Sequence, residues 1–554
     1  MDRFPGAGAY FYFTVKARRT RSARQLTAVI LAFGLSSASL AVAQTQHSSA
    51  TAGELRAETA LRSAKRMGAP EVYALLKPFP KGADLHMHLS GAVYAETFIA
   101  EAIQQNLCVA PVDPGKPPAP TGENAVELAQ PPCGKNAVPA ATALTSQPLY
   151  DNLIDSFSMR AFVPREGING HDQFFATFAR FGGLQDVTGA WLDEVASRAA
   201  AQNEQYLEIM NTPSFSNAAR LGAQIGWPAG SETSVTHETL AALREKLLAA
   251  GLRSEVSTDE KQFSDAAAER KTIEHCSGAL QSPACGVEIH FLYQVLRGFP
   301  PQQVFAQTLL GFEVASADPD VVGINFVMPE DGRVSMRDYH LQMQMLDYLH
   351  SVYPSVHISL HAGELAPGMV PPEGLRFHIR EAVELGHAER IGHGVDVLYE
   401  DRPRELLKEM AARHIDVEVN LTSNDVILGI KGSDHPLAAY RAAHVPYSIS
   451  TDDEGVSRID LTHEYVRAVM EQDLGYADLK LSARDSLQHS FLHGEGLWQN
   501  EDAYTRMRSG CSMPAGPQAA PSGSCKRFLD GNEKAREQWE LERRFVAFEA
   551  SLPH

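Results

Sequence analysis

The sequence predicts a (β/α)8 barrel of the α/β class, with surface insertions and extra terminal helices. Eight short apolar runs recur along the chain, and helix-like stretches such as 238–251 and 374–386 lie between them, as parallel crossovers require. A barrel of about 250 residues also fits into 554 residues with room for insertions. The predicted strands are 83–88, 205–210, 287–293, 321–327, 356–361, 390–394, 415–421 and 446–451.

The amino end, residues 1–43, has the pattern of an export signal. Arg18, Arg19, Arg21 and Arg24 directly precede the apolar stretch 26–40, and the small residues Ala41-Val42-Ala43 come before Gln44. We expect cleavage after Ala43, a periplasmic or secreted protein, and no membrane association once the signal is removed. A retained membrane anchor is the alternative, which the shortness of the apolar run disfavours.

The mature chain divides into three parts. Residues 44–80 are predicted to form a helical lead-in, and residues 81–504 are predicted to form the barrel. Within the barrel, 104–150 is rich in Pro and Ala and predicts a long surface insertion. At the carboxyl end, 505–554, a loop over 505–527 is followed by a charged amphipathic helix expected to pack outside the barrel.

The six cysteines lie in three neighbouring pairs, each around a loop containing Pro, Gly or Ser. In an exported chain this predicts three local disulfides, Cys108–Cys133, Cys276–Cys285 and Cys511–Cys525. Six cysteines permit 15 pairings, so the connectivity stays open, and free buried thiols are the alternative.

The formal net charge of −19 becomes about −24 after residues 1–43 are removed, because that segment carries six basic residues and one acidic residue. Such a surface repels nucleic acid phosphates. The charge therefore argues against a nucleic acid partner and favours a small neutral or weakly charged molecule. It leaves the oligomeric state open.

The first chemical motif is the pair His86 and His88. Alternate residues of a strand face the same side, about 7 Å apart, so both imidazoles can reach one ion. Neutral imidazole suits zinc, and a catalytic zinc site keeps one position open. An isolated pair of this kind is more often incidental, but His361, His393 and Asp452 each end a predicted strand before turn residues. Ligands at several strand ends fit the mouth of a barrel.

Four clusters carry a family resemblance: ADLHMHL at 83–89, SLHAGE at 359–364, RIGHG at 390–394 and STDDEG at 450–455. In this order and spacing they resemble the adenosine deaminase family of metal-dependent hydrolases, over roughly 75–500. The resemblance implies one Zn²⁺ per chain. Zinc deaminases with cysteine ligands carry a C-x-x-C signature, which this chain lacks.

The resemblance also implies roles. Four residues match the family's zinc ligands: His86, His88, His361 and Asp452. Glu364 matches the proton-transferring glutamate, and His393 matches the histidine beside the attacking water. The chemistry agrees, because attack on C6 of an aminopurine requires protonation of the adjacent ring nitrogen, and a poised carboxylic acid can supply that proton and then return one to the departing ammonia.

Three residues match positions that recognise the substrate. Asp453 matches an aspartate that hydrogen-bonds the purine ring, and the backbone around Met328 lies where the family binds another purine nitrogen. Relatives commonly have an aspartate that meets the ribose hydroxyl two residues beyond the second histidine, but this chain has Ser90. Met328-Pro329 also replaces a segment that contains Gly. These departures leave the reaction type intact and weaken the identification of the substrate.

We therefore expect zinc-dependent hydrolysis of adenosine and 2′-deoxyadenosine to the inosines and ammonia, with a purine nucleoside as the small-molecule partner. The near alternative is deamination of adenine or another 6-aminopurine, and another is hydrolysis of a non-purine amide or ester. A third is a secreted binding or growth-factor-like protein on a deaminase barrel. The complete set of seven metal, catalytic and purine-ring residues argues against this last reading.

Overall fold

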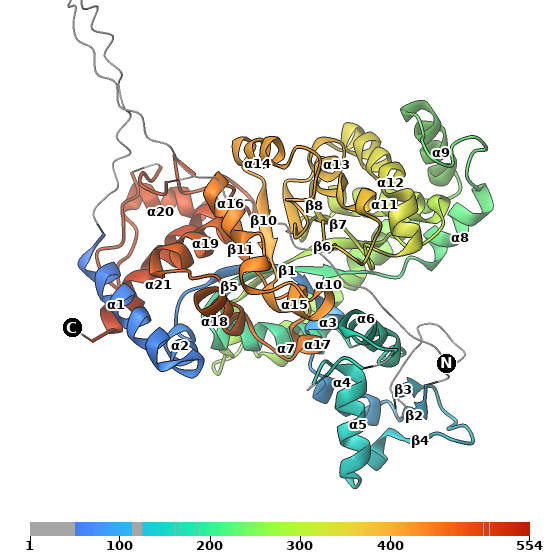
Figure 1. Cartoon of the computed structure of the whole chain (residues 1–554), viewed down its shortest axis with the longest axis horizontal. Coiled ribbons are helices and arrows are strands. Elements are labelled where there is room, and N and C mark those ends of the chain that lie inside the picture. The colour runs from blue at the N-terminus through green and yellow to red at the C-terminus, as the bar shows by residue number, and fades with distance from the viewer. Residues whose placement is uncertain are drawn as a thin grey trace, which may run out of the picture. The chain divides into compact units, whose positions relative to one another are not determined.

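A computed structural model describes residues 50–112, 125–160, 162–165, 167–185, 187–501, 503–508 and 510–553. The predicted export signal and its cleavage site lie outside these ranges. The helices are α1 (Ala52–Met67), α2 (Ala69–Leu76), α3 (Leu89–Ala92), α4 (Ala95–Gln104), α5 (Gln147–Phe157), α6 (Gly170–Arg180), α7 (Thr188–Ala201), α8 (Ser216–Ile225), α9 (His237–Ala249), α10 (Val256–Ile273), α11 (Pro301–Ala317), α12 (Arg333–Val352), α13 (His378–Glu384), α14 (Pro403–Ala412), α15 (Leu421–Leu428), α16 (Leu437–Ala443), α17 (Glu454–Ser457), α18 (Leu461–Glu471), α19 (Tyr476–Gln488), α20 (Gly523–Asp530) and α21 (Glu533–Ser551) (Figure 1).

Eight parallel strands form the barrel: β1 (Gly82–His88), β5 (Glu204–Asn211), β6 (Glu288–Leu296), β7 (Val321–Val327), β8 (His357–Ala362), β9 (Arg390–His393), β10 (Asp416–Val419) and β11 (Tyr447–Ile449). Their spatial order follows the sequence. The ring nearly closes where β1 meets Asp452, three residues beyond the end of β11, because His88 N–H donates to the Asp452 carbonyl at 3.1 Å and Asp452 N–H donates to the His86 carbonyl at 2.8 Å. The predicted (β/α)8 fold and all eight predicted strands are confirmed.

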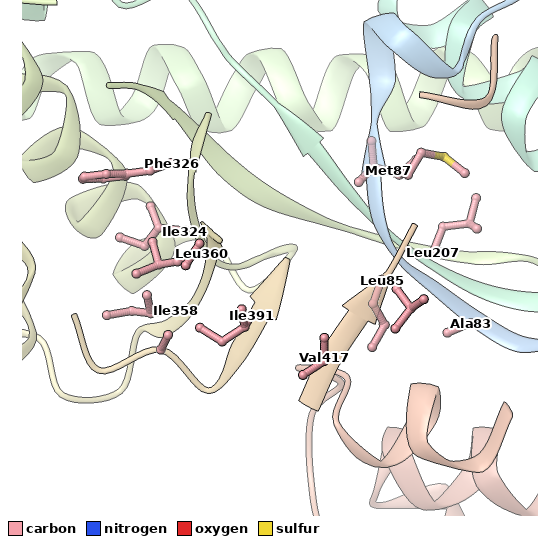
Figure 2. Packing of buried hydrophobic residues seen from close by; sticks show 14 of the residues in the cluster. Ala83, Leu85, Met87, Leu207, Ile324, Phe326, Ile358, Leu360, Ile391 and Val417 are labelled. Carbon is pink, nitrogen blue, oxygen red and sulfur yellow. The ribbon is translucent and has the colours of Figure 1, made fainter. Parts of the chain in front are cut away.

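Alternation along each strand separates the barrel's apolar packing from its chemistry. Ala83, Leu85 and Met87 are buried on one face of β1 and pack in the main apolar cluster with residues from β5, β7 and β8 (Figure 2). His86 and His88 take the alternate positions, so they face the barrel interior. The apolar outer layer thus fixes the register that brings the polar residues together inside.

The segment between β1 and β5 carries a small second unit of structure. Strands β2 (Cys108–Pro111), β3 (Val126–Ala129) and β4 (Val138–Pro139) form an antiparallel sheet within the predicted insertion 104–150, beside α4 and α5 (Figure 1). It has its own apolar cluster, in which Phe98 and Phe181 stack with their ring centroids 4.3 Å apart. Helix α6 belongs to this cluster and reaches the barrel mouth.

The terminal helices pack together on the barrel. Phe545 and Phe548 of α21 contact Phe79, which follows α2. The segment predicted as a loop over 505–527 differs at its end, because α20 begins at Gly523 and buries Cys525 and Leu529 against the residues around Trp539. The predicted disulfides Cys108–Cys133, Cys276–Cys285 and Cys511–Cys525 are all present. Among the described residues, no helix is both long and apolar enough to cross a membrane.

Candidate active site

The four predicted metal ligands meet at the carboxyl ends of the barrel strands. His86 and His88 come from β1, His361 comes from β8, and Asp452 follows β11. The Nε2 atom of His361 lies 3.1 Å from Nε2 of His86 and 3.1 Å from Nε2 of His88. Asp452 Oδ1 lies 3.2 Å from His88 Nε2 and 3.5 Å from His86 Nε2. All four residues are buried, with donor atoms converging on one point.

The hydrogen bond made by Nδ1 of each histidine determines which kind of group can bind at this point. Each Nδ1 faces a side-chain oxygen: His86 lies 2.6 Å from Glu418 Oε2, His88 lies 2.7 Å from Gln294 Oε1, and His361 lies 2.6 Å from Asn325 Oδ1. The Nδ1 atoms therefore carry the protons, and three Nε2 lone pairs face one another and a carboxylate. That arrangement is repulsive unless a cation lies among them, and it is the usual support of metal-binding histidines. The residues fit a metal such as zinc.

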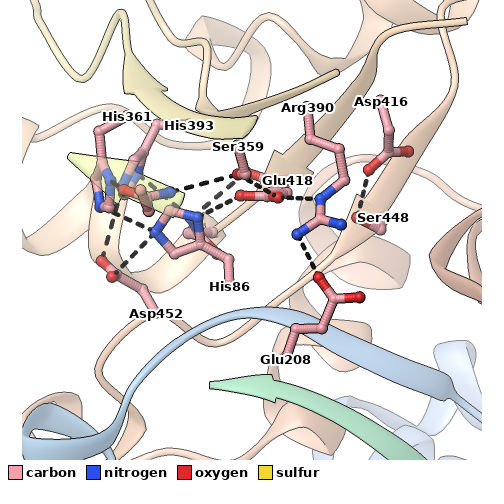
Figure 3. Close-up of polar contacts among 12 residues, drawn as sticks. His86, Glu208, Ser359, His361, Arg390, His393, Asp416, Glu418, Ser448 and Asp452 are labelled. Atoms are coloured by element: carbon pink, nitrogen blue, oxygen red, sulfur yellow. Dashed lines mark hydrogen bonds and ion pairs between the residues drawn. The ribbon is translucent and has the colours of Figure 1, made fainter. Parts of the chain in front are cut away.

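A buried network of charged side chains contacts His86 on the Nδ1 side of its ring, away from the converging donor atoms (Figure 3). Arg390 Nε donates to Glu418 Oε1 at 2.6 Å, and Arg390 Nη2 lies 2.7 Å from Glu208 Oε2. Ser359 also donates to Glu418 Oε1 at 2.9 Å. Although burial alone would raise it, Arg390 and His86 lower the pKa of Glu418 to about 2. Glu418 is therefore a permanent anion that orients the His86 ring.

A chain of hydrogen bonds fixes the proton on His393. His435 Nδ1 accepts from Leu437 N–H at 3.2 Å, so its Nε2 carries the proton and donates to Asn424 Oδ1 at 3.1 Å. The amide nitrogen of Asn424 then donates to His393 Nδ1 at 2.9 Å. Burial lowers the pKa of His393 to about 3, so the ring is neutral. Its proton therefore sits on Nε2, which has no partner among the described residues and lies 3.9 Å from Asp452 Oδ2.

The carboxyl group of Glu364 is held beside the ligands by its own backbone. Glu330 accepts from the backbone N–H groups of Gly363 at 3.0 Å and Glu364 at 2.7 Å, and it is paired with His378 Nδ1 at 2.5 Å. Burial, together with the negative charges of Asp452 and Glu330, raises the pKa of Glu364 well above its ordinary value. The protonated form of Glu364, which a general acid needs, is thus favoured by its surroundings.

Backbone strain gathers at this site. Met328 (φ 101°), His393 (φ 70°) and Asp452 (φ 60°) all adopt positive φ, which residues other than glycine rarely do. Each such residue costs of the order of 1–3 kcal/mol, and such costs cluster at functional sites. Arg297, which is fully buried, holds the backbone at the ends of β7 and β8 by donating to the carbonyl oxygens of Met328 and His361.

A cavity of about 480 Å³ opens over the ligands. Asp453, Ser90 and Met328 all line it, so the predicted substrate residues join the predicted catalytic ones. Asp453 Oδ1 has no partner among the described residues. A side chain at position 91 would overlap the Asp453 carboxylate. Only glycine therefore allows the backbone at this position to lie so close to Asp453. Apolar residues form much of the remaining wall: Phe174, Phe175, Phe178, Leu296, Val327, Pro329 and Ile427.

Several supporting residues escaped the sequence analysis. Gln294, Asn325 and Glu418 are polar residues between apolar neighbours in the barrel strands, and that contrast is a signal that sequence reasoning can use. Glu330 carried no comparable signal, because it lies in a loop. Phe174, Phe175 and Phe178 of α6 also gave none, because the sequence of a helix in the long segment between β1 and β5 does not show where that helix packs.

Comparisons with known proteins place the chain in a family. Residues 184–497, more than half of the chain, match the family model described as adenosine deaminase. The chain belongs to the adenosine deaminase family. An adenosine deaminase of Escherichia coli O157:H7 is 38% identical over 140 residues, which span 25% of this chain and 39% of that protein. The aligned stretch thus covers well under half of this curated relative.

Solved structures with similar folds include two deaminases. An adenine deaminase from Arthrobacter aurescens is 17% identical, with a TM-score of 0.46 over 74% of this chain and 94% of that one. An N6-mAMP deaminase from Arabidopsis is 20% identical, with a TM-score of 0.46 over 75% of this chain and 94% of that one.

Proposed function

We propose that the protein is a zinc-dependent hydrolase that deaminates adenosine and 2′-deoxyadenosine to inosine or 2′-deoxyinosine and ammonia. The observation that carries this proposal is the convergence of three unprotonated imidazole nitrogens and the Asp452 carboxylate beside a buried acid, Glu364. Membership of the adenosine deaminase family supports the reaction class. When bound there, zinc would lower the pKa of a water molecule toward about 7.

The chain's own residues supply the remaining chemistry. His393 Nε2–H is directed at the ligand cluster and donates a hydrogen bond to the attacking oxygen. Glu364 gives its proton to the ring nitrogen next to C6 as the tetrahedral centre forms; its carboxylate then takes the proton of the new C6 hydroxyl and passes it to the departing amine, so that ammonia leaves as the C6 carbonyl forms. Asp453 binds a ring nitrogen through its unpartnered Oδ1. Because their positions are fixed before the substrate arrives, these groups need little reorganisation during the reaction.

The cavity supports an uncharged nucleoside as substrate. No Lys or Arg is among the described residues that line it, and much of its wall is apolar. A 5′-phosphate would lose its water there without gaining a cationic partner. The volume of about 480 Å³ lies within the range of small-molecule sites, which accommodates a nucleoside as well as a free base. Ser90 Oγ is then the group available to a sugar hydroxyl.

We also propose that the protein acts in the periplasm or outside the cell. The three disulfides support this, because disulfides persist in oxidising compartments and are rare in the cytosol.

A substrate panel tests the proposed function. Zinc-loaded mature protein is assayed for ammonia release from adenosine, 2′-deoxyadenosine, adenine, N6-methyladenosine and adenosine 5′-monophosphate. We expect the two nucleosides to give the highest kcat/KM and the monophosphate to be at least about 100-fold poorer. Preference for adenine or N6-methyladenosine would reassign the pocket around Ser90. No turnover of any of these compounds would contradict the proposal.

A further inference from the structure

A second cluster of metal-binding side chains lies at the opposite end of the barrel from the cavity. His290 is near the start of β6, His493 follows α19, and Glu533 begins α21. One donor atom from each lies within 4.8 Å of the others. Asp320, which directly precedes β7, adds a carboxylate oxygen 4.0 Å from His290 Nε2. His290 is buried, whereas His493 and Asp320 are exposed, so solvent reaches the cluster from one side.

The hydrogen bonds of the two histidines show which nitrogen each presents. Tyr206 donates its hydroxyl proton to Glu208 at 2.9 Å, so the same oxygen is free to accept from His290 Nδ1 at 3.3 Å. His493 Nε2 lies 2.8 Å from the carbonyl oxygen of Pro319, which can only accept. The nitrogens left without a proton are therefore Nε2 of His290 and Nδ1 of His493. Both rings are held in the tautomer that a metal requires.

We propose that His290, His493 and Glu533 form a second site for a divalent transition metal of the zinc type, with Asp320 as a further oxygen donor. A ligand set of two imidazoles and a carboxylate favours zinc over magnesium or calcium. Arg536 lies 3.3 Å from Glu533 Oε1, which leaves Oε2 for the ion. A bound cation neutralises a group of lone pairs and carboxylates that otherwise face one another.

The site would act as a structural clamp. Its ligands come from the barrel strand β6, from the loop after α19 and from the first residue of α21, which are far apart in sequence. Glu533 is partly exposed and can close on the ion by side-chain rotation. The metal would therefore fasten the carboxyl-terminal helix to the barrel and stabilise the folded state by binding it selectively. This role is independent of the deaminase reaction.

Zinc stoichiometry tests the proposal. Tag-free mature protein is stripped with a chelator, titrated with ZnCl2 and analysed by calorimetry and elemental analysis. We expect two equivalents per chain in the wild type and one in His493→Ala, which keeps its deaminase activity. His361→Ala should keep the second equivalent while losing the catalytic one. His340→Ala, an exposed helical histidine beside Glu381, is the matched control and should bind two.

Thermal melting and a second variant complete the test. Zinc beyond one equivalent should raise the Tm of the wild type but not that of His493→Ala. Glu533→Gln, which changes one carboxylate at the surface, should weaken the second site at least tenfold and covers the case in which His493→Ala fails to fold. Saturation of the wild type at one equivalent, or two equivalents in both variants with unchanged affinity, would overturn the proposal.

Discussion

Replacement of Glu418 by Gln removes one buried charge and leaves its shape. In the wild type the Glu418 carboxylate accepts from His86 Nδ1 and Arg390 Nε, both at 2.6 Å. Its pKa of about 2 lies about 2.5 units below the ordinary value of 4.5. At about 1.36 kcal/mol per unit, the ionised form gains about 3 kcal/mol from its folded surroundings. Removing one partner of a buried ion pair lowers the free energy of unfolding by a similar amount, about 3–5 kcal/mol.

Two measurements follow from this. Urea unfolding of metal-free protein should show the free energy of unfolding reduced by about 3 kcal/mol in Glu418→Gln. Competition with a chromophoric chelator should show zinc bound about 10–100-fold more weakly, because the His86 ring loses its anionic partner. The matched control is Glu389→Gln at the barrel surface, whose ion pair with His357 is half exposed and contributes at most about 1 kcal/mol. A Glu418→Gln protein with wild-type stability and zinc affinity would refute the reasoning.

Further predictions concern the reaction and acid stability. Glu364→Gln should retain zinc and lose about 10²–10⁴-fold in kcat, because it deletes a proton carrier while leaving every ligand; turnover near the wild-type rate would remove Glu364 from its role. In Asn424→Asp the carboxylate can only accept from His393, so the ring proton should move from Nε2 to Nδ1. This should lower kcat about 10²–10³-fold at unchanged zinc content; an unaltered kcat would contradict the assigned tautomer. The pKa values of Glu418 and Glu330 are depressed to about 2 from 4.5, so their stabilisation is complete above about pH 5 and is lost as the pH falls toward 2; acid titration of the metal-free protein, followed by circular dichroism, should show this, whereas constant stability across that range would not fit.

The sequence was sufficient for the fold because barrel strands have a strong local signal. A run such as VVGINFV is apolar, short and bounded by turn residues, and it forms β7 over the predicted residues. The four residues that converge on the metal position were equally readable, since each lies within or directly after such a run. Residues such as Asn325 and Glu418 inside these runs gave a signal for the supporting residues that the sequence analysis did not use, because an unexplained polar group in a buried strand needs a partner.

The remaining features depend on tertiary contacts that local patterns do not encode. Nothing in the sequence of α6 shows that Phe174 and Phe178 face the cavity, because that depends on how the segment between β1 and β5 packs on the barrel. The partners that fix the His393 tautomer are separated along the chain, and their roles follow only from hydrogen-bond geometry. The antiparallel sheet inside the predicted insertion has strands of only two to four residues, too short for a readable alternation.

The most direct test of the central claim is the ultraviolet absorbance change of adenosine with purified mature protein in three states: as loaded with zinc, after removal of metal by a chelator, and after zinc is added back. We predict conversion to inosine by the loaded protein, its loss on chelation and its recovery on reloading. Conversion that persists in rigorously metal-free protein, or its absence in zinc-loaded protein, would contradict a metal-dependent adenosine deaminase.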